Sequence, residues 1–218
     1  MNSTVPNRAN SSDPGRPSEA AATIASYDAT ATEFASRWGT LRLERALAAF
    51  TQHLAGRRQV LDLGCGPGRD VDFLTHLDCT VVGLDLSAGM LSEARKRLPH
   101  APLIQADLRV PPLASERFDG IWACASLLHL PRAGFGPALA ELVRLLRKPG
   151  GVLYLALKGG QGEQWITGQS GRRAFFTYYQ PDEIETSLAH AGFQILERWM
   201  AEDQAGRDQP WINVVARL

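Results

Sequence analysis

Residues 60–68 read VLDLGCGPG, and this stretch decides the fold of the chain. An apolar run containing Asp62 is typical of a short buried β-strand, and three glycines follow it at Gly64, Gly66 and Gly68. Because glycine has no Cβ atom, such a turn can adopt positive φ angles and let a ligand contact bare backbone. A helical pattern begins directly after the turn. Strand, glycine turn and helix together predict the nucleotide-binding unit of an α/β sheet.

The spacing of the turn distinguishes two classes of nucleotide ligand. A dinucleotide-binding turn has the spacing G-x-G-x-x-G, and Arg69 stands where its third glycine would be. A second acid, Asp85, ends the next apolar run, where a carboxylate can accept both hydroxyls of a ribose. Asp62 would repel a pyrophosphate, but it would attract a ligand that carries an amine and a sulfonium. These features favour S-adenosylmethionine over NAD.

On these residues, the chain resembles the class I S-adenosylmethionine-dependent methyltransferases over roughly residues 25–218. The resemblance implies that Gly64 and Gly66 approach the methionine part of the cofactor. It also implies that Asp85 binds the ribose hydroxyls and that Leu86 lies beside the adenine.

Further cofactor contacts are expected from a third strand end and from the N-terminal region. Asp107 resembles the family acid that accepts the adenine amino group, with Leu108 beside it, although Asp107 alone would be read as a loop cap. Tyr27 is either a core residue or a ring that faces the sulfonium, since aromatic faces attract cations. The expected cofactor-binding residues are Asp62, Gly64, Gly66, Gly68, Asp85, Leu86, Asp107, Leu108 and Tyr27.

Apolar periodicity predicts strands that alternate with helices from residue 60 onward. The expected strands are 60–63, 80–84, 103–106, 118–124, 152–157, 193–199 and 211–217. The last two follow each other without a helix, so they must be antiparallel, because a parallel connection needs a longer crossover. The sequence therefore predicts an α/β fold with a doubly wound, mostly parallel seven-stranded sheet and an antiparallel last strand. This is the Rossmann-like architecture of the methyltransferase family.

The domain organisation follows from composition. Residues 1–22 begin with a stretch almost free of large apolar side chains, which predicts a disordered tail. Residues 23–218 are expected to form one domain. Within it, residues 23–55 predict helices, and the family resemblance implies that they form a cap over the cofactor. Residues 158–179 predict a glycine-rich loop that acts as an acceptor lid.

The acceptor side is less defined than the cofactor side. Methyltransferases that act on DNA bases or protein amides carry an Asn/Asp-Pro-Pro-Tyr/Phe box after the fourth strand, and residues 123–129 lack it. The Leu-His pair that ends this segment instead resembles the subgroup that acts on small molecules. His129 is therefore a candidate general base, with the alternative that it is a histidine oriented by a backbone carbonyl.

The predicted lid supplies the candidates for acceptor binding. Lys158, Glu163, Arg173 and Tyr178 lie in the glycine-rich segment that leaves the fifth strand, and Arg173 is the best choice for an anionic acceptor. The alternative is a solvated connection whose aromatic residues only anchor it to the core.

Composition restricts the possible partners. Lys plus Arg equals Asp plus Glu at 23 each, so no net field is expected to attract nucleic acid or an anionic membrane. The sequence has neither a long apolar run nor a signal-peptide pattern, which leaves the cytoplasm as the expected location. Cys65, Cys79 and Cys124 lack metal-ligand spacing, so we expect structural thiols and no metal.

Three functions remain open from the sequence. The leading hypothesis is an enzyme that transfers a methyl group from S-adenosylmethionine to a small-molecule acceptor. The second is a methyltransferase-fold module that binds the cofactor without catalysis. The third is an NAD-dependent oxidoreductase, which Arg69 and the charge of Asp62 disfavour.

Overall fold

The computed structural model describes residues 19–168, 171, 173–203, 206 and 208–218. Most of the predicted N-terminal tail therefore lies outside the described residues. The helices are α1 (Glu19–Ala29), α2 (Ala31–Trp38), α3 (Glu44–Thr51), α4 (Arg69–His76), α5 (Ala88–Arg97), α6 (Phe135–Leu145) and α7 (Pro181–His190), with short 3₁₀ turns at Leu127–His129 and Arg132–Gly134. The strands are β1 (Gln59–Leu63), β2 (Thr80–Asp85), β3 (Leu103–Gln105), β4 (Gly120–Cys124), β5 (Val152–Gly159), β6 (Glu163–Thr167), β7 (Arg173–Tyr179), β8 (Gln194–Ala201) and β9 (Trp211–Arg217).

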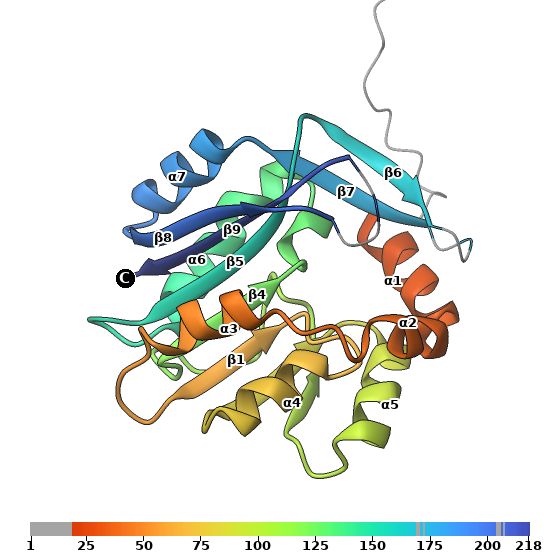
Figure 1. The fold of residues 1–218 in the computed structure, drawn as a ribbon, viewed down its shortest axis with the longest axis horizontal. Helices are drawn as coiled ribbons and strands as arrows, with labels where there is room; N and C mark the ends of the chain where they lie inside the picture. Colours follow the sequence, from red (N-terminus) through yellow and green to blue (C-terminus); the bar gives the residue numbers. More distant parts are fainter. Residues whose placement is uncertain (1–18, 169–170, 172, 204–205, 207) are drawn as a thin grey trace, which may run out of the picture.

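Within the described residues, these strands form one nine-stranded sheet. β1 pairs in parallel with β2 and β4, β2 pairs with β3, and β4 pairs with β5. β9 runs antiparallel to β5, and β8 runs antiparallel to β9. This path confirms the predicted doubly wound sheet with an antiparallel last strand. In Figure 1 the arrowheads of β1 and β4 point toward the side where α1 and α2 lie.

The prediction of a glycine-rich loop over residues 158–179 is wrong. The segment contains the end of β5 and an antiparallel hairpin of β6 and β7, which adds two strands to the expected seven. β7 pairs with β5 only at its end, through Tyr178 and Tyr179. The stretch from Arg173 to Tyr179 is rich in aromatic residues and carries the β-branched Thr177. These residue types favour strands, and they outweigh the glycines that precede them.

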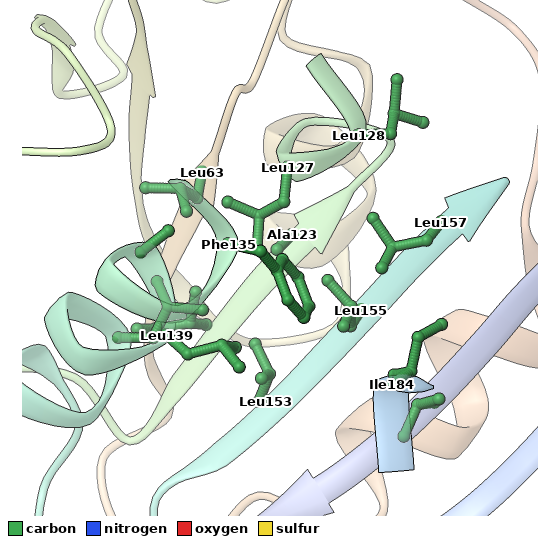
Figure 2. Packing of buried hydrophobic residues seen from close by; sticks show 14 of the residues in the cluster. Leu63, Ala123, Leu127, Leu128, Phe135, Leu139, Leu153, Leu155, Leu157 and Ile184 are labelled. Carbon is green, nitrogen blue, oxygen red and sulfur yellow. The ribbon is translucent and has the colours of Figure 1, made fainter. Parts of the chain in front are cut away.

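Side chains alternate between the two faces of the sheet and form two cores. Leu61 of β1 points to the core beneath α6 and α7, whereas Val60 points to the core beneath α3 and α4. Figure 2 shows the first core, where Phe135 of α6 lies among side chains of β4 and β5. In the second core, Phe50 of α3 packs edge-on against Trp122, with ring centroids 5.4 Å apart. Both sheet faces are therefore covered, as a parallel sheet requires.

The N-terminal helices divide into a cap and a packing helix. α1 begins at Glu19, so the predicted tail of residues 1–22 extends too far; Glu19 and the alanines after it favour helix. Asp28 of α1 accepts hydrogen bonds from Ser87 Oγ at 2.5 Å and from Gly89 N at 2.8 Å. On its other side, Thr23 Oγ1 accepts from Phe175 N of β7 at 3.1 Å. α1 thus bridges α5 and β7 over the end of the sheet, while α3 packs against the sheet face.

Over the part of the chain that the structure describes, we find no helix with the length and apolar character to cross a bilayer.

Candidate active site

The glycine turn connects β1 to α4 at the carboxyl end of the sheet. Gly64 and Cys65 donate their backbone N–H groups to Leu84 O at 2.7 and 3.0 Å, which ties the turn to β2. Gly64 has φ +81°, and a Cβ atom there would lie 2.4 Å from Ser126 Cβ. Gly66 has φ +52°, and no described atom lies within 4 Å of where its Cβ would be. The turn therefore presents open backbone at Gly66, as a closely approaching ligand requires.

Gly68 has a different role from the one expected. It adopts φ +78° at the start of α4, and a Cβ atom there would lie 3.1 Å from Leu98 Cδ1 and 3.2 Å from Ala94 Cβ. Gly68 does not line the cavity described below. It allows close packing between α4 and α5, so its predicted contact with the cofactor has no support.

Asp85 ends β2 directly opposite the turn. Its Oδ2 atom accepts from Gly66 N at 2.8 Å, and its Oδ1 atom accepts from Ser87 N at 2.8 Å. Burial raises the pKa of Asp85, and these backbone donors oppose the rise. Each carboxylate oxygen can accept a further hydrogen bond, because it has two lone pairs. Asp85 is thus held in place by the turn and lines the same cavity as Gly66.

Asp62 lies buried within β1 behind the turn. Its Oδ2 atom has no hydrogen-bond partner among the described residues. Burial raises the pKa of Asp62 well above its ordinary value; the charge of Asp70 adds to the rise, and that of Arg69 opposes it. A buried carboxyl oxygen without a partner is costly, so Asp62 fits a position close to a site that receives a cation.

The acid at the end of the third strand is already partnered. Asp107 accepts from the Arg109 backbone N at 2.9 Å and from its guanidinium at 2.5–3.0 Å, and the side-chain bond to Arg109 lowers the pKa of Asp107. Asp107 remains on the cavity wall beside Leu108 and Leu86.

A first cavity of about 200 Å³ joins these groups beneath the cap. Its wall includes seven of the nine predicted cofactor residues: Tyr27, Gly64, Gly66, Asp85, Leu86, Asp107 and Leu108. Asp62 and Gly68 lie outside this lining. Residues from the turn after β1, from the end of β2, from the segment after β3 and from α1 therefore converge on one space.

His129 lines this cavity from the 3₁₀ turn after β4. Its Nδ1 atom is 2.7 Å from Phe175 O, and its Nε2 atom is 2.9 Å from the Tyr27 hydroxyl. A carbonyl can only accept, so Nδ1 carries the proton and Nε2 accepts from Tyr27. His129 is thus oriented by a backbone carbonyl, as one of the two alternatives expected, and its role as a general base stays a prediction.

A second cavity, also of about 200 Å³, opens from the same place along the face of β5 and β9. Both cavities are lined by Tyr27, Phe34, Trp38, Arg69, Cys124, Ala125 and His129. The Tyr27–His129 pair therefore stands where the two cavities meet. Burial raises the pKa of Cys124 above its usual range, so its thiol is neutral there and is a poor base or nucleophile.

The four predicted acceptor residues lie outside the linings of both cavities. Lys158 is 1% exposed, and its Nζ atom lies 2.8 Å from Asp203 Oδ2. Glu163 accepts from Arg132 N at 2.5 Å, and Tyr178 is buried. Arg173 stacks over the Trp165 ring at 4.6 Å on the outside of the hairpin. Acceptor contact by these side chains stays a prediction without support from their positions. The hairpin instead supplies Phe176 to the second cavity.

Several cavity residues were not predicted from the sequence. Arg69 lines both cavities and donates from Nε and Nη2 to the two oxygens of Asp70, each at 2.7 Å. Arg69 is the first residue of the helix that follows the glycine turn, and this position in the sequence could have marked it as a cavity residue. Tyr154 and Asn213 line the second cavity from β5 and β9, and nothing local in the sequence distinguishes them from core residues.

Within the described residues, no group of three or more His, Cys, Asp or Glu side chains could hold a metal ion.

An open parallel sheet with a glycine turn and acids at the ends of its first strands defines a nucleotide-binding α/β protein. Residues 60–151 match the family model described as a methyltransferase domain. Residues 60–151 are therefore similar to a methyltransferase domain, and the fold of the chain is that of S-adenosylmethionine-dependent methyltransferases.

Curated relatives match about half of this chain. A malonyl-[acyl-carrier protein] O-methyltransferase of Enterobacter lignolyticus is 42% identical over 117 residues, which cover 50% of this chain and 43% of the relative. A trans-aconitate 2-methyltransferase of Acidovorax sp. (strain JS42) is 43% identical over 104 residues, covering 46% and 38%. The chain thus spans less than half the length of either relative.

Solved structures match a larger share of the chain at lower identity. The 1,6-didemethyltoxoflavin-N1-methyltransferase of Burkholderia thailandensis has a TM-score of 0.74 and 21% identity, covering 97% of this chain and 93% of its own. The [4+2]-cyclase SpnF has a TM-score of 0.62 and 20% identity, covering 79% of each chain. These likenesses show the fold alone, because one fold can carry different reactions.

Proposed function

We propose that this chain transfers a methyl group from S-adenosylmethionine to a small-molecule acceptor. The observation that carries the proposal is the meeting of the two cavities at Tyr27 and His129. The first cavity is lined by residues that are predicted to bind the cofactor, and the second cavity has room for an acceptor. The methyltransferase family match and the names of the curated relatives support the same reaction.

The residues of the first cavity fit S-adenosylmethionine. Asp85 would accept from the ribose hydroxyls, and Leu86 and Leu108 would contact the adenine. The open backbone of Gly66 would face the methionine end, and the buried Asp62, which lies behind the turn and outside the cavity lining, would act on its positive charges through the turn. When bound, S-adenosylmethionine supplies a methyl group on a sulfonium sulfur, which keeps the electron pair of the methyl–sulfur bond as S-adenosylhomocysteine forms.

Tyr27 and His129 are placed to remove a proton from the acceptor. The acceptor O–H or N–H would give its proton to Tyr27 Oη, while the Tyr27 proton moves to His129 Nε2. The resulting imidazolium keeps its Nδ1–H bond to Phe175 O, which needs no rearrangement of the ring. The walls of the two cavities would also align the reactants, since holding two reactants in line accounts for much of the rate of such a transfer.

Calorimetry and product detection test the proposal against its alternatives. S-adenosylmethionine should bind the purified chain, and NAD should not. Release of S-adenosylhomocysteine in the presence of a metabolite panel should then identify an acceptor. Tight cofactor binding with no turnover on any candidate acceptor would favour the non-catalytic binding module, and preference for NAD would favour the oxidoreductase.

Asp85→Ala is expected to weaken S-adenosylmethionine binding by about 1–3 kcal/mol, the usual cost of losing charge-assisted hydrogen bonds. The substitution also removes the acceptor for Gly66 N, so the turn loses a support. Isothermal titration calorimetry measures the effect, with Asp119→Ala as a control at the opposite end of the sheet. An unchanged affinity in a folded Asp85→Ala variant would remove the ribose assignment.

Cofactor binding is expected to weaken as the pH falls through the raised pKa of Asp62. The raised pKa of Asp62 means that acid protonates this carboxyl in the free protein, whereas a bound cation favours the carboxylate. Binding should therefore release a proton in the window between the two pKa values. Calorimetry in buffers of different ionisation enthalpy measures that release. The Asp62→Asn variant should release fewer protons than the parent chain. Equal release from both proteins would contradict the assignment.

A further inference from the structure

The second cavity, where the acceptor would bind if the proposed function is correct, is walled largely by aromatic rings. They come from the N-terminal helices α1 and α2, from β7, and from β5 and β9. The rings are Tyr27, Phe34, Trp38, Tyr154, Phe176 and Trp211. Aromatic walls favour flat aromatic ligands, because offset-stacked and edge-to-face ring pairs stabilise contact beyond the area they bury.

The buried charges on this wall are already balanced. The guanidinium of Arg69 is paired with both oxygens of Asp70, and Asp203 lies 2.8 Å from the Nζ atom of Lys158. The Asp203 and Lys158 side chains are 4% and 1% exposed. Glu202 is the remaining charged residue among the described lining residues, and it is exposed. An anionic acceptor would therefore lose its hydration without gaining an unbalanced cation.

The floor of the second cavity is polar but carries no charge. The Tyr154 hydroxyl donates to Asn213 Oδ1 at 2.7 Å, and Asn213 Nδ2 makes a long bond to Trp211 O at 3.4 Å. Burial raises the pKa of Tyr154 well above its usual range, so its hydroxyl stays neutral. A phenol and an amide can orient a neutral polar substituent on an otherwise apolar ligand.

We infer that the acceptor is a neutral, flat aromatic molecule that inserts its ring system between the cap and the β5–β9 floor. Its O–H or N–H lies at the junction with Tyr27 and His129, where the proton leaves. This class differs from the tricarboxylate named for one group of curated relatives. The inference rests on the proposed function, since the second cavity is an acceptor site only if the first holds the cofactor.

Three naphthalenes that differ mainly in charge test the inference. 2-Naphthol is neutral, 2-naphthoate is anionic, and 2-naphthylmethylamine is cationic at neutral pH; trans-aconitate serves as the polyanion. Binding to the full chain saturated with S-adenosylhomocysteine is measured by calorimetry. We expect 2-naphthol to bind at least about tenfold more tightly than each of the other three. Absence of 2-naphthol binding, or equal or tighter binding of a charged probe, would overturn the inference.

Filling the second cavity checks that 2-naphthol binds there. Ala156→Leu adds bulk on the β5 floor, and Leu43→Trp adds bulk at the cap side; both positions line the second cavity and not the first. Each should weaken 2-naphthol binding about tenfold or more and leave S-adenosylhomocysteine affinity within about twofold. Ala189→Leu on the exposed side of α7 is the matched control.

Different results would contradict the proposed function and the acceptor class. If S-adenosylhomocysteine does not bind the parent chain, the proposed function fails and the inference fails with it. If it binds but neither filling variant weakens 2-naphthol binding, the assignment of the second cavity is wrong while the proposed function stands.

Discussion

Lys158→Met is expected to lower the free energy of unfolding by about 3–5 kcal/mol, the cost of removing one partner from a buried ion pair. Lys158 Nζ contacts Asp203 Oδ2 and also donates to Gln209 O at 2.8 Å, and it lies 4.2 Å from the centroid of the Trp211 ring. Methionine keeps the length of the side chain but leaves the Asp203 carboxylate buried without its cation. Urea unfolding at neutral pH measures the loss.

Two further variants decide whether the buried pair is responsible. Lys158→Met combined with Asp203→Asn removes both charges and should recover a large part of the lost stability. Lys96→Met breaks an equally short pair with Glu93, but the Lys96 side chain is 65% exposed. Surface pairs contribute little, so this variant should unfold close to the parent midpoint. A Lys158→Met midpoint as close to the parent would contradict the structural role of Lys158.

Lys158 shows why the acceptor side was difficult to predict from the sequence. A lysine beside glycines at the end of a strand is typical of a ligand-facing loop, and the sequence gives no sign of its partner. That partner, Asp203, lies beyond β6, β7, α7 and β8 in the sequence, and the pairing of β5 with β9 brings the two segments together. The same holds for the Tyr154–Asn213 floor, because cross-strand neighbours depend on register and not on local composition.

The sheet and the cofactor edge were predictable because their signals are local. The apolar runs before Asp62 and Asp85 predict buried strands by themselves, and the glycine spacing fixes the turn between β1 and α4. Parallel strands present their carboxyl ends at one edge, so acids that end successive strands are expected to converge there. The hairpin of β6 and β7 was not predicted, because the glycines before and between its strands indicate a loop while its aromatic residues indicate a strand.

His129→Asn is expected to lower kcat for the identified acceptor by about 10²–10⁴-fold, the usual contribution of a positioned general base. Asparagine retains an N–H donor that can reach Phe175 O, but it has no basic atom in place of Nε2. Tyr27→Phe should cause a loss of similar size, since it removes the hydroxyl that connects the acceptor to His129. Steady-state kinetics with saturating S-adenosylmethionine measures both.

The double variant separates proton transfer from simple packing. Because Tyr27 and His129 act on one proton path, the combined substitution should cost little more than either alone, whereas independent packing losses would add. A kcat within about threefold of the parent in both single variants would mean that the acceptor loses its proton without help from this pair. The two side chains would then only shape the junction of the cavities.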